Sequence, residues 1–176
     1  MKVLAILVLL LVITPSIGNA QVTKCKCTTD DIDSFTGDRI VQTKFYPIGV
    51  TEKGKELKMS IRRVNTTYFI HLVSPWPYNC AGPLTKISFK NTGGIVYNLK
   101  HIGEVDCGST NGNSGITTKI PPNLMFRVED ENILRQPIAM IRLEDEKDYI
   151  NLVPTVPFSL KTVADCADTT FKQTPK

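Results

Sequence analysis

The sequence predicts a mostly β fold, a single antiparallel sandwich-like or partly closed barrel domain with one or two short helices in its C-terminal third. Three observations carry this prediction. Apolar and polar residues alternate over many short segments, which is typical of half-buried strands. Residues that favour turns separate these segments at short intervals. Neither a long linker nor a low-complexity tract divides residues 21–176, and a chain of that length fits one domain with its own core.

The clearest strand is residues 56–63, which should form a hairpin with residues 67–73. Its two faces carry Leu57, Met59 and Ile61 on one side and Lys58, Ser60 and Arg62 on the other. Residues 64–66 are expected to form the turn, and residues 67–73 are rich in β-branched and aromatic side chains that favour strands. The apolar face should be buried against the rest of the domain.

A second hairpin is expected to follow, with strands 85–90 and 95–102 around a glycine-containing loop. An earlier strand, 39–46, should end at Pro47. The remaining elements are strands at 116–120, 138–143 and 149–153, a short helix at 129–136 and a C-terminal helix at 158–171.

The first twenty residues have the three parts of a cleavable secretion signal. Met1 and Lys2 give a positive start, residues 3–13 are apolar, and Gly18-Asn19-Ala20 supplies small residues before the cleavage point. An apolar run of this length is too short to span a membrane. We therefore expect cleavage after Ala20 and a secreted chain, extracellular or periplasmic, that does not span the membrane.

The charge is only mildly basic, with a formal net charge of +4. The basic cluster at residues 53–63 is preceded by Glu52 and interrupted by Glu56, and acidic runs follow at 129–131 and 144–146. Nucleic-acid binding normally needs a stronger basic stripe. The sequence therefore predicts no nucleic-acid partner.

The chain has five cysteines, at positions 25, 27, 80, 107 and 166. Because an exported chain passes through an oxidising compartment, disulfides are expected, and the odd number leaves one thiol over. If strand 67–73 runs upward, Cys80 and Cys107 emerge at the same end of the fold, so we predict that they pair. Cys166 then pairs with Cys25 or Cys27.

The segment Ser74-Pro75-Trp76-Pro77-Tyr78 is the best candidate for ligand binding. It places Trp76 and Tyr78 on a proline-stiffened loop, where aromatic rings can stack on a sugar or anchor a protein partner. The alternative is that Trp76 covers the open end of the core. The predicted disulfide would tether this loop to the flexible segment 108–115.

Catalytic and cofactor signals are weak. The two histidines, His71 and His101, each lie in a predicted strand, outside any recognisable catalytic motif. Cys25 and Cys27 lack the gap that is usual between zinc ligands, and residues 103–110 lack the lysine of a phosphate loop. We predict no catalytic residue, metal or cofactor. Asn65-Thr66-Thr67 is a formal N-glycosylation acceptor.

The residues Asp33-Ser-Phe-Thr-Gly-Asp-Arg-Ile40, followed by a charged strand and by Met59-Ser-Ile-Arg-Arg-Val-Asn65, resemble the opening of small exported bacterial β-rich proteins of unknown function. The resemblance implies export and a β-rich fold and carries no activity. We therefore expect a secreted, non-catalytic binding module for an unknown protein or carbohydrate ligand. The alternatives are an exported hydrolase of unrecognised type and a structural component of envelope assembly.

Overall fold

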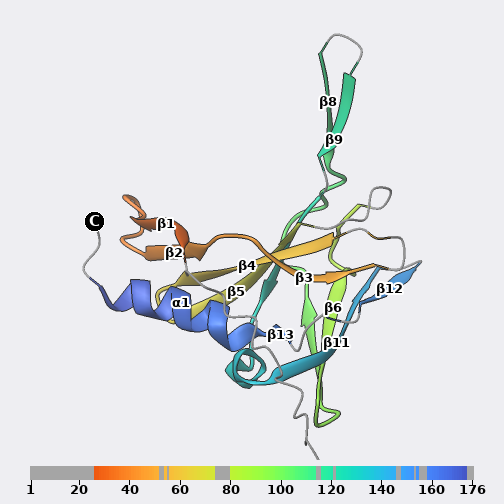
Figure 1. The fold of residues 1–176 in the computed structure, drawn as a ribbon. Coiled ribbons are helices and arrows are strands. Elements are labelled where there is room, and N and C mark those ends of the chain that lie inside the picture. The colour runs from red at the N-terminus through yellow and green to blue at the C-terminus, as the bar shows by residue number, and fades with distance from the viewer. Residues whose placement is uncertain are drawn as a thin grey trace, which may run out of the picture.

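The computed structural model describes residues 26–51, 54, 56–73, 80–113, 116–120, 122–145, 148–152, 154 and 158–173. They form two antiparallel sheets, a separate two-stranded hairpin and one C-terminal α-helix (Figure 1). The fold is therefore mostly β and sandwich-like, as predicted, and the described strands do not close into a barrel. The predicted signal, residues 1–20, lies outside the described residues.

The first sheet has the strand order β1-β2-β4-β5-β10, with β3 also paired to β4. Its strands are β1 (Cys27–Ile32), β2 (Arg39–Thr43), β3 (Tyr46–Val50), β4 (Glu56–Val64), β5 (Thr67–Val73) and β10 (Asn123–Arg127). The chain bends between β2 and β3, which pair with successive parts of β4. At the bend the Thr43 hydroxyl accepts the backbone N–H of Ile61 at 3.0 Å, so this amide keeps a partner where the ladder is interrupted.

The prediction that Pro47 ends a strand is wrong, because Pro47 lies inside β3. Proline has no N–H to donate, but β3 pairs with β4 alone, and a strand at the edge of a sheet can leave that position unpaired. The predicted strand 39–46 is thus two strands separated by residues 44–45. Neither β1 nor β10 was predicted.

The second sheet has the order β12-β11-β6-β7, with the short β13 also paired to β11. Its strands are β6 (Lys86–Asn91), β7 (Val96–Lys100), β11 (Pro137–Glu144), β12 (Tyr149–Leu152) and β13 (Phe158–Ser159). A bridge between His101, which follows β7, and Phe126 in β10 links the two sheets. Next to it, the N–H of Ile102 donates to the carbonyl of Met125 at 2.9 Å.

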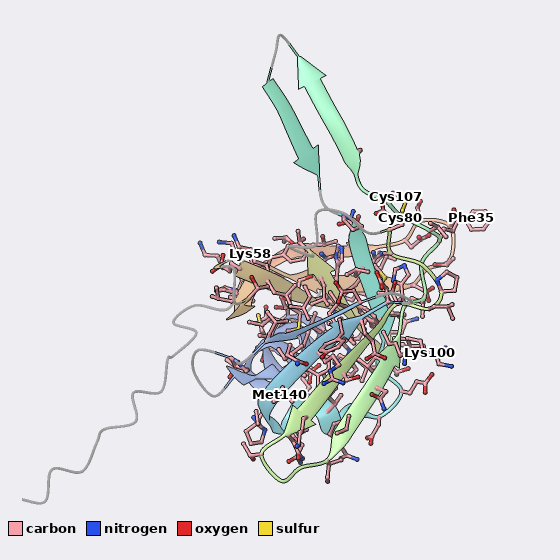
Figure 2. The ribbon with its side chains drawn as sticks, turned by 90° about the vertical axis from the view of Figure 1, so that its right-hand side faces the viewer. Phe35, Lys58, Cys80, Lys100, Cys107 and Met140 are labelled. Atoms are coloured by element: carbon pink, nitrogen blue, oxygen red, sulfur yellow. A yellow bond between two sulfur atoms is a disulfide. The ribbon has the colours of Figure 1, made fainter. Side chains whose placement is uncertain are left out.

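Strands β8 (Ser109–Asn113) and β9 (Ile116–Ile120) form a hairpin that stands away from both sheets (Figure 1). Strand β9 has the predicted bounds. The segment that was expected to be flexible, residues 108–115, instead contains β8. Figure 2 shows the hairpin leaving the body of the protein beside Cys80 and Cys107.

Helix α1 (Leu160–Lys172) packs on β1, β2 and β4 of the first sheet, close to the predicted helix at 158–171. Its buried residues are Leu160, Val163, Ala164, Cys166 and Ala167. The other predicted helix, 129–136, is a 3-10 helix, η1 (Glu131–Arg135). The Asp130 side chain begins it by accepting the backbone N–H of Asn132, as an N-cap residue does.

The core lies between the first sheet on one side and the second sheet and α1 on the other. Leu57, Met59 and Ile61 are fully buried, as the alternation predicts. Ser60, which the alternation assigns to the other face of β4, is fully buried as well. It lies opposite His71 in the β4–β5 register and accepts a hydrogen bond from Gln42, so neighbouring side chains cover it on the outer face.

Candidate binding site

The turn between β1 and β2 presents an aromatic ring to solvent. Phe35 lies in this turn with a relative exposure of 97%, the highest among the exposed large apolar residues. The Asp33 carboxylate accepts the backbone N–H groups of Phe35 and Thr36, both at 2.9 Å. Two backbone bonds, from Asp33 to Asp38 and from Gly37 to Asp33, close the turn at 2.8 Å each. The backbone that carries the ring is therefore held by several hydrogen bonds.

Two further features stabilise this turn. Gly37 has a φ of +75°, a conformation that costs a glycine little. The two backbone N–H bonds also lower the pKa of Asp33, because they favour the ionised carboxylate, with the Thr36 amide acting most strongly. The hydrogen bonds of the turn therefore favour the ionised form of Asp33.

Asn65 links this turn to the turn between β4 and β5. Its side-chain amide donates to the carboxylate of Asp38, and its side-chain oxygen accepts the backbone N–H of Arg39 at 3.1 Å. Asn65 itself has a φ of +50°, which asparagine tolerates better than most residues. The predicted glycosylation acceptor is thus a residue whose side chain joins two turns.

A groove with a volume of about 480 Å³ lies beside the Phe35 turn, on the face of the first sheet that points away from the core. One set of lining residues comes from β1 and the turn, and the other from β2 and β4. They are Thr29, Asp31, Ile32, Asp33 and Ser34, with Ile40, Gln42 and Arg62. The groove therefore offers carboxylates, a guanidinium, an amide and aliphatic surface within one concavity.

Arg62 is the cation of this groove. In the part of the chain that the structure describes, its guanidinium has neither a hydrogen bond nor an ion pair. Its side chain is half-buried and lies across the β2–β4 pairing from Gln42. All five of its N–H donors are thus available to carbonyl or carboxylate oxygens of a bound molecule. Asp31 and Asp33 supply acceptors on the opposite wall.

A small polar cluster continues from Gln42 along the same face of the sheet. The Gln42 side-chain nitrogen lies 3.3 Å from the Ser60 hydroxyl and 3.4 Å from Nδ1 of His71. The Phe45 ring packs edge-on against His71, with 5.0 Å between ring centroids. The other ring nitrogen of His71, Nε2, is buried without a hydrogen-bond partner.

Burial lowers the pKa of His71, because the charged imidazolium loses its hydration. The charge of Arg62 acts in the same direction, and an interaction with the Asn123 side chain opposes both. His71 is therefore neutral near pH 7.

His101, the second histidine, has a structural role. Its Nδ1 lies 3.1 Å from the backbone of Met125, and its ring packs edge-on against Phe126. A Cβ atom added to Gly103 would lie only 2.7 Å from its Nε2, so the chain passes close over the ring. The other ring nitrogen of His101, Nε2, lies 3.4 Å from the backbone carbonyl of Glu104. Among the described residues, no hydrogen bond joins either histidine to a carboxylate.

The structure contains the predicted disulfide between Cys80 and Cys107. Cys80 immediately precedes Ala81, and Cys107 immediately follows Asp106. Ala81 and Asp106 form a bridge in which their backbones exchange hydrogen bonds of 2.7 and 2.9 Å. The expected strand directions therefore place both cysteines at one end of the fold, beside the base of the hairpin (Figure 2).

Cys166 was expected to pair with Cys25 or with Cys27, and the structure excludes one of these two pairings. Cys27 carries a free thiol, which donates to the Thr170 hydroxyl at 3.2 Å, so the pairing of Cys27 with Cys166 is wrong. Cys166 is disulfide-bonded, and Cys25 lies outside the described residues.

The predicted ligand-binding residues Trp76 and Tyr78 also lie outside the described residues and stay predictions.

Sequence reasoning missed the Phe35 turn as a site. The signal was available, because Asp33-Ser-Phe-Thr-Gly-Asp38 combines residues that bond to their own backbone with a glycine. Such a segment predicts a tight turn, and its phenylalanine has no neighbours there to cover it.

Comparison with protein-family models, curated proteins and solved structures found no match to this chain. Within the described residues, no group of three or more His, Cys, Asp or Glu side chains is placed to hold a metal ion. No helix in the same residues is long and apolar enough to cross a membrane.

Proposed function

We propose that this protein is an exported, non-catalytic module that binds a partner protein through the Phe35 turn and the adjoining groove. The observation that carries the proposal is the 97% exposure of Phe35 on a turn whose backbone is fixed by hydrogen bonds. Aromatic anchors of this kind dominate the energetics of protein interfaces. The signal sequence and the Cys80–Cys107 disulfide support export.

The exposed ring of Phe35 keeps nearly all of its apolar surface in water. Moving a phenylalanine side chain from water into an apolar pocket contributes about 1.5–3 kcal/mol. Because the turn is already held, little conformational entropy is lost when Phe35 is bound. The ring therefore contributes nothing to the core of this chain and has its full apolar surface to offer a partner.

The groove can hold a peptide segment of the same partner. Backbone carbonyls or a carboxylate would accept from Arg62, and backbone N–H groups would donate to Asp31 or Asp33. Ile32, which is 48% exposed, and Ile40 supply apolar contacts beside these polar groups. This mixture matches an extended protein segment better than it matches a purely apolar ligand.

The histidines support binding over hydrolysis. A serine hydrolase needs a base that reaches both its nucleophile and an orienting carboxylate. Ser60 and His71 are neighbours across the β4–β5 pairing, but Ser60 is fully buried and Gln42, an amide, takes the place of the carboxylate. A substrate would have no access to the Ser60 hydroxyl.

The proposal is tested by placing a photo-reactive amino acid at position 35 in the native host. The matched control places it at Ile95, which is also exposed, at 57%, but lies in the turn between β6 and β7. We expect one defined protein to be cross-linked from position 35 and not from position 95. Cross-linking that is equal at both positions, or a cross-link to carbohydrate alone, would contradict the proposal.

A further inference from the structure

The β8–β9 hairpin has no other strand beside it in the described part of the chain. Figures 1 and 2 both show it projecting from the body of the protein. A two-stranded hairpin alone is only marginally stable in water. Its outer edges also leave backbone N–H and C=O groups free to pair with another strand. An additional strand would therefore stabilise it.

The base of the hairpin is fixed by described contacts. The Asp106 carboxylate accepts the N–H of Gly108 at 2.7 Å and the N–H of Asn123 at 2.8 Å, and these residues flank the hairpin on its two sides. The Cys80–Cys107 disulfide lies directly beside this carboxylate in the chain. The hairpin is thus presented in a defined direction, which lowers the cost of ordering its edge against a partner.

Of the two edges, that of β9 is the better one for pairing. Its sequence, Ile-Thr-Thr-Lys-Ile, consists of β-branched residues and one lysine, whereas β8 reads Ser-Thr-Asn-Gly-Asn. β-branched residues favour strands, and glycine and asparagine disfavour them. A partner strand therefore gains more from β9 than from β8.

The sequence of β9 is complementary to itself in antiparallel pairing. If two copies pair about Thr118, Ile116 lies opposite Ile120 of the partner subunit, and Thr117 lies opposite Lys119 of the partner subunit. Thr118 lies opposite its own counterpart, and no two like charges face each other. Every second residue of β9 directs its backbone N–H and C=O groups away from β8. In this register those residues of one copy lie opposite the equivalent residues of the other, so their backbone groups can bond.

We propose that two copies of this chain associate through β9, forming a four-stranded antiparallel sheet from two hairpins. This pairing brings the Ile116 end of each β9 strand toward the base of the other hairpin. Three aliphatic residues are exposed on the segments that the disulfide joins at that base: Leu84 at 59%, Ile102 at 50% and Val105 at 65%. The hairpin of the partner subunit would cover part of this apolar surface. The dimer would present two Phe35 turns.

The test is sedimentation of the full chain from micromolar to millimolar concentration, for the unaltered protein and for T118K. In T118K two lysines face each other at the centre of the seam, so we expect dimerisation to weaken at least about tenfold. The matched control is N111K. Asn111 pairs with Thr118 within the hairpin, so this substitution places the same charge on strand β8, away from the proposed seam. N111K should change dimerisation less than about threefold.

A mixture of T118K with T118E separates lost pairing from lost folding. Each variant alone should be mainly monomeric, and the mixture should form a heterodimer, because opposite charges then meet at the seam. A monomeric unaltered chain at every concentration would overturn the proposal. So would equal weakening by T118K and N111K, or a mixture that stays monomeric.

Discussion

Replacing Arg39 by methionine should destabilise the fold more than the loss of any surface charge. Its guanidinium binds the Asp30 carboxylate at 2.9–3.2 Å and donates to three carbonyls at the end of α1: those of Phe171 and Gln173 at 2.6 Å and of Thr170 at 3.1 Å. The last carbonyls of a helix have no partner within it, and a cation there also favours the helix dipole. Arg39 therefore joins β1, β2 and α1.

The expected magnitude follows from burial. The side chains of Arg39 and Asp30 are only 12% and 17% exposed, so the change strands a mostly buried carboxylate. Breaking such a pair costs about 3–5 kcal/mol, and the residual exposure favours the lower end, about 3 kcal/mol. In a domain of this size that corresponds to a fall of roughly 6–12 °C in Tm.

Thermal and urea unfolding of R39M and of K58A measure this difference. Lys58 pairs with Glu56 at 3.2 Å, but the two side chains are 51% and 45% exposed, so K58A should cost no more than about 1 kcal/mol. Figure 2 shows Lys58 at the surface of the protein. If R39M is as stable as K58A, the role of Arg39 in holding α1 is refuted.

Three further predictions concern stability. The pKa of His71 is lowered from its ordinary 6.5, mainly by burial. The free energy of unfolding should therefore fall as pH drops below about 6.5, by at most about 1.4 kcal/mol per pH unit. Urea titrations at pH 5 and pH 7 measure this slope, and H71Q should flatten it. G103A should cost about 1–3 kcal/mol, because the new Cβ would lie 2.7 Å from Nε2 of His101; a variant as stable as the unaltered chain speaks against that contact. Replacing Cys80 and Cys107 by serine should cost roughly 3–4 kcal/mol for the 27-residue separation, measured by urea unfolding, and an unchanged midpoint would show that the bridge does not stabilise the fold.

Local sequence patterns predicted the parts of the fold that depend on neighbouring residues. The alternation in 56–63 predicted the buried face of β4, and the glycine-containing loop 91–94 predicted the second hairpin. The strand directions then predicted that Cys80 and Cys107 pair. Each of these features follows from a period of two or from a turn, which a single sequence displays.

The features that were missed depend on contacts between distant residues. Strand β1 carries two aspartates, and Asp30 is tolerated there because Arg39 and the end of α1 surround it. Ser60 is buried because Gln42 and His71 lie against it, and no local pattern reveals that cover. A proline in a sequence usually indicates the end of a strand. The sequence alone does not show that Pro47 lies in a strand at the edge of a sheet, because that position depends on pairing with β4.

The candidate site was missed for a related reason. An exposed phenylalanine and a buried one look alike in a sequence, and exposure is decided by what the rest of the chain places nearby. The proline-rich segment 74–78 drew attention because tryptophan and proline are conspicuous residues, whereas Phe35 lies among ordinary turn residues. Only the fold shows that its ring is 97% exposed.

The most direct test of the binding proposal is to measure F35A against the partner identified by cross-linking. At 97% exposure the ring contributes almost nothing to folding, so the free energy of unfolding should change by less than about 0.5 kcal/mol. Binding should weaken by about 2 kcal/mol or more, roughly thirtyfold in Kd, because the ring is the anchor. The control I95A should change neither quantity. An affinity that F35A leaves unchanged, with the fold intact, would contradict the account.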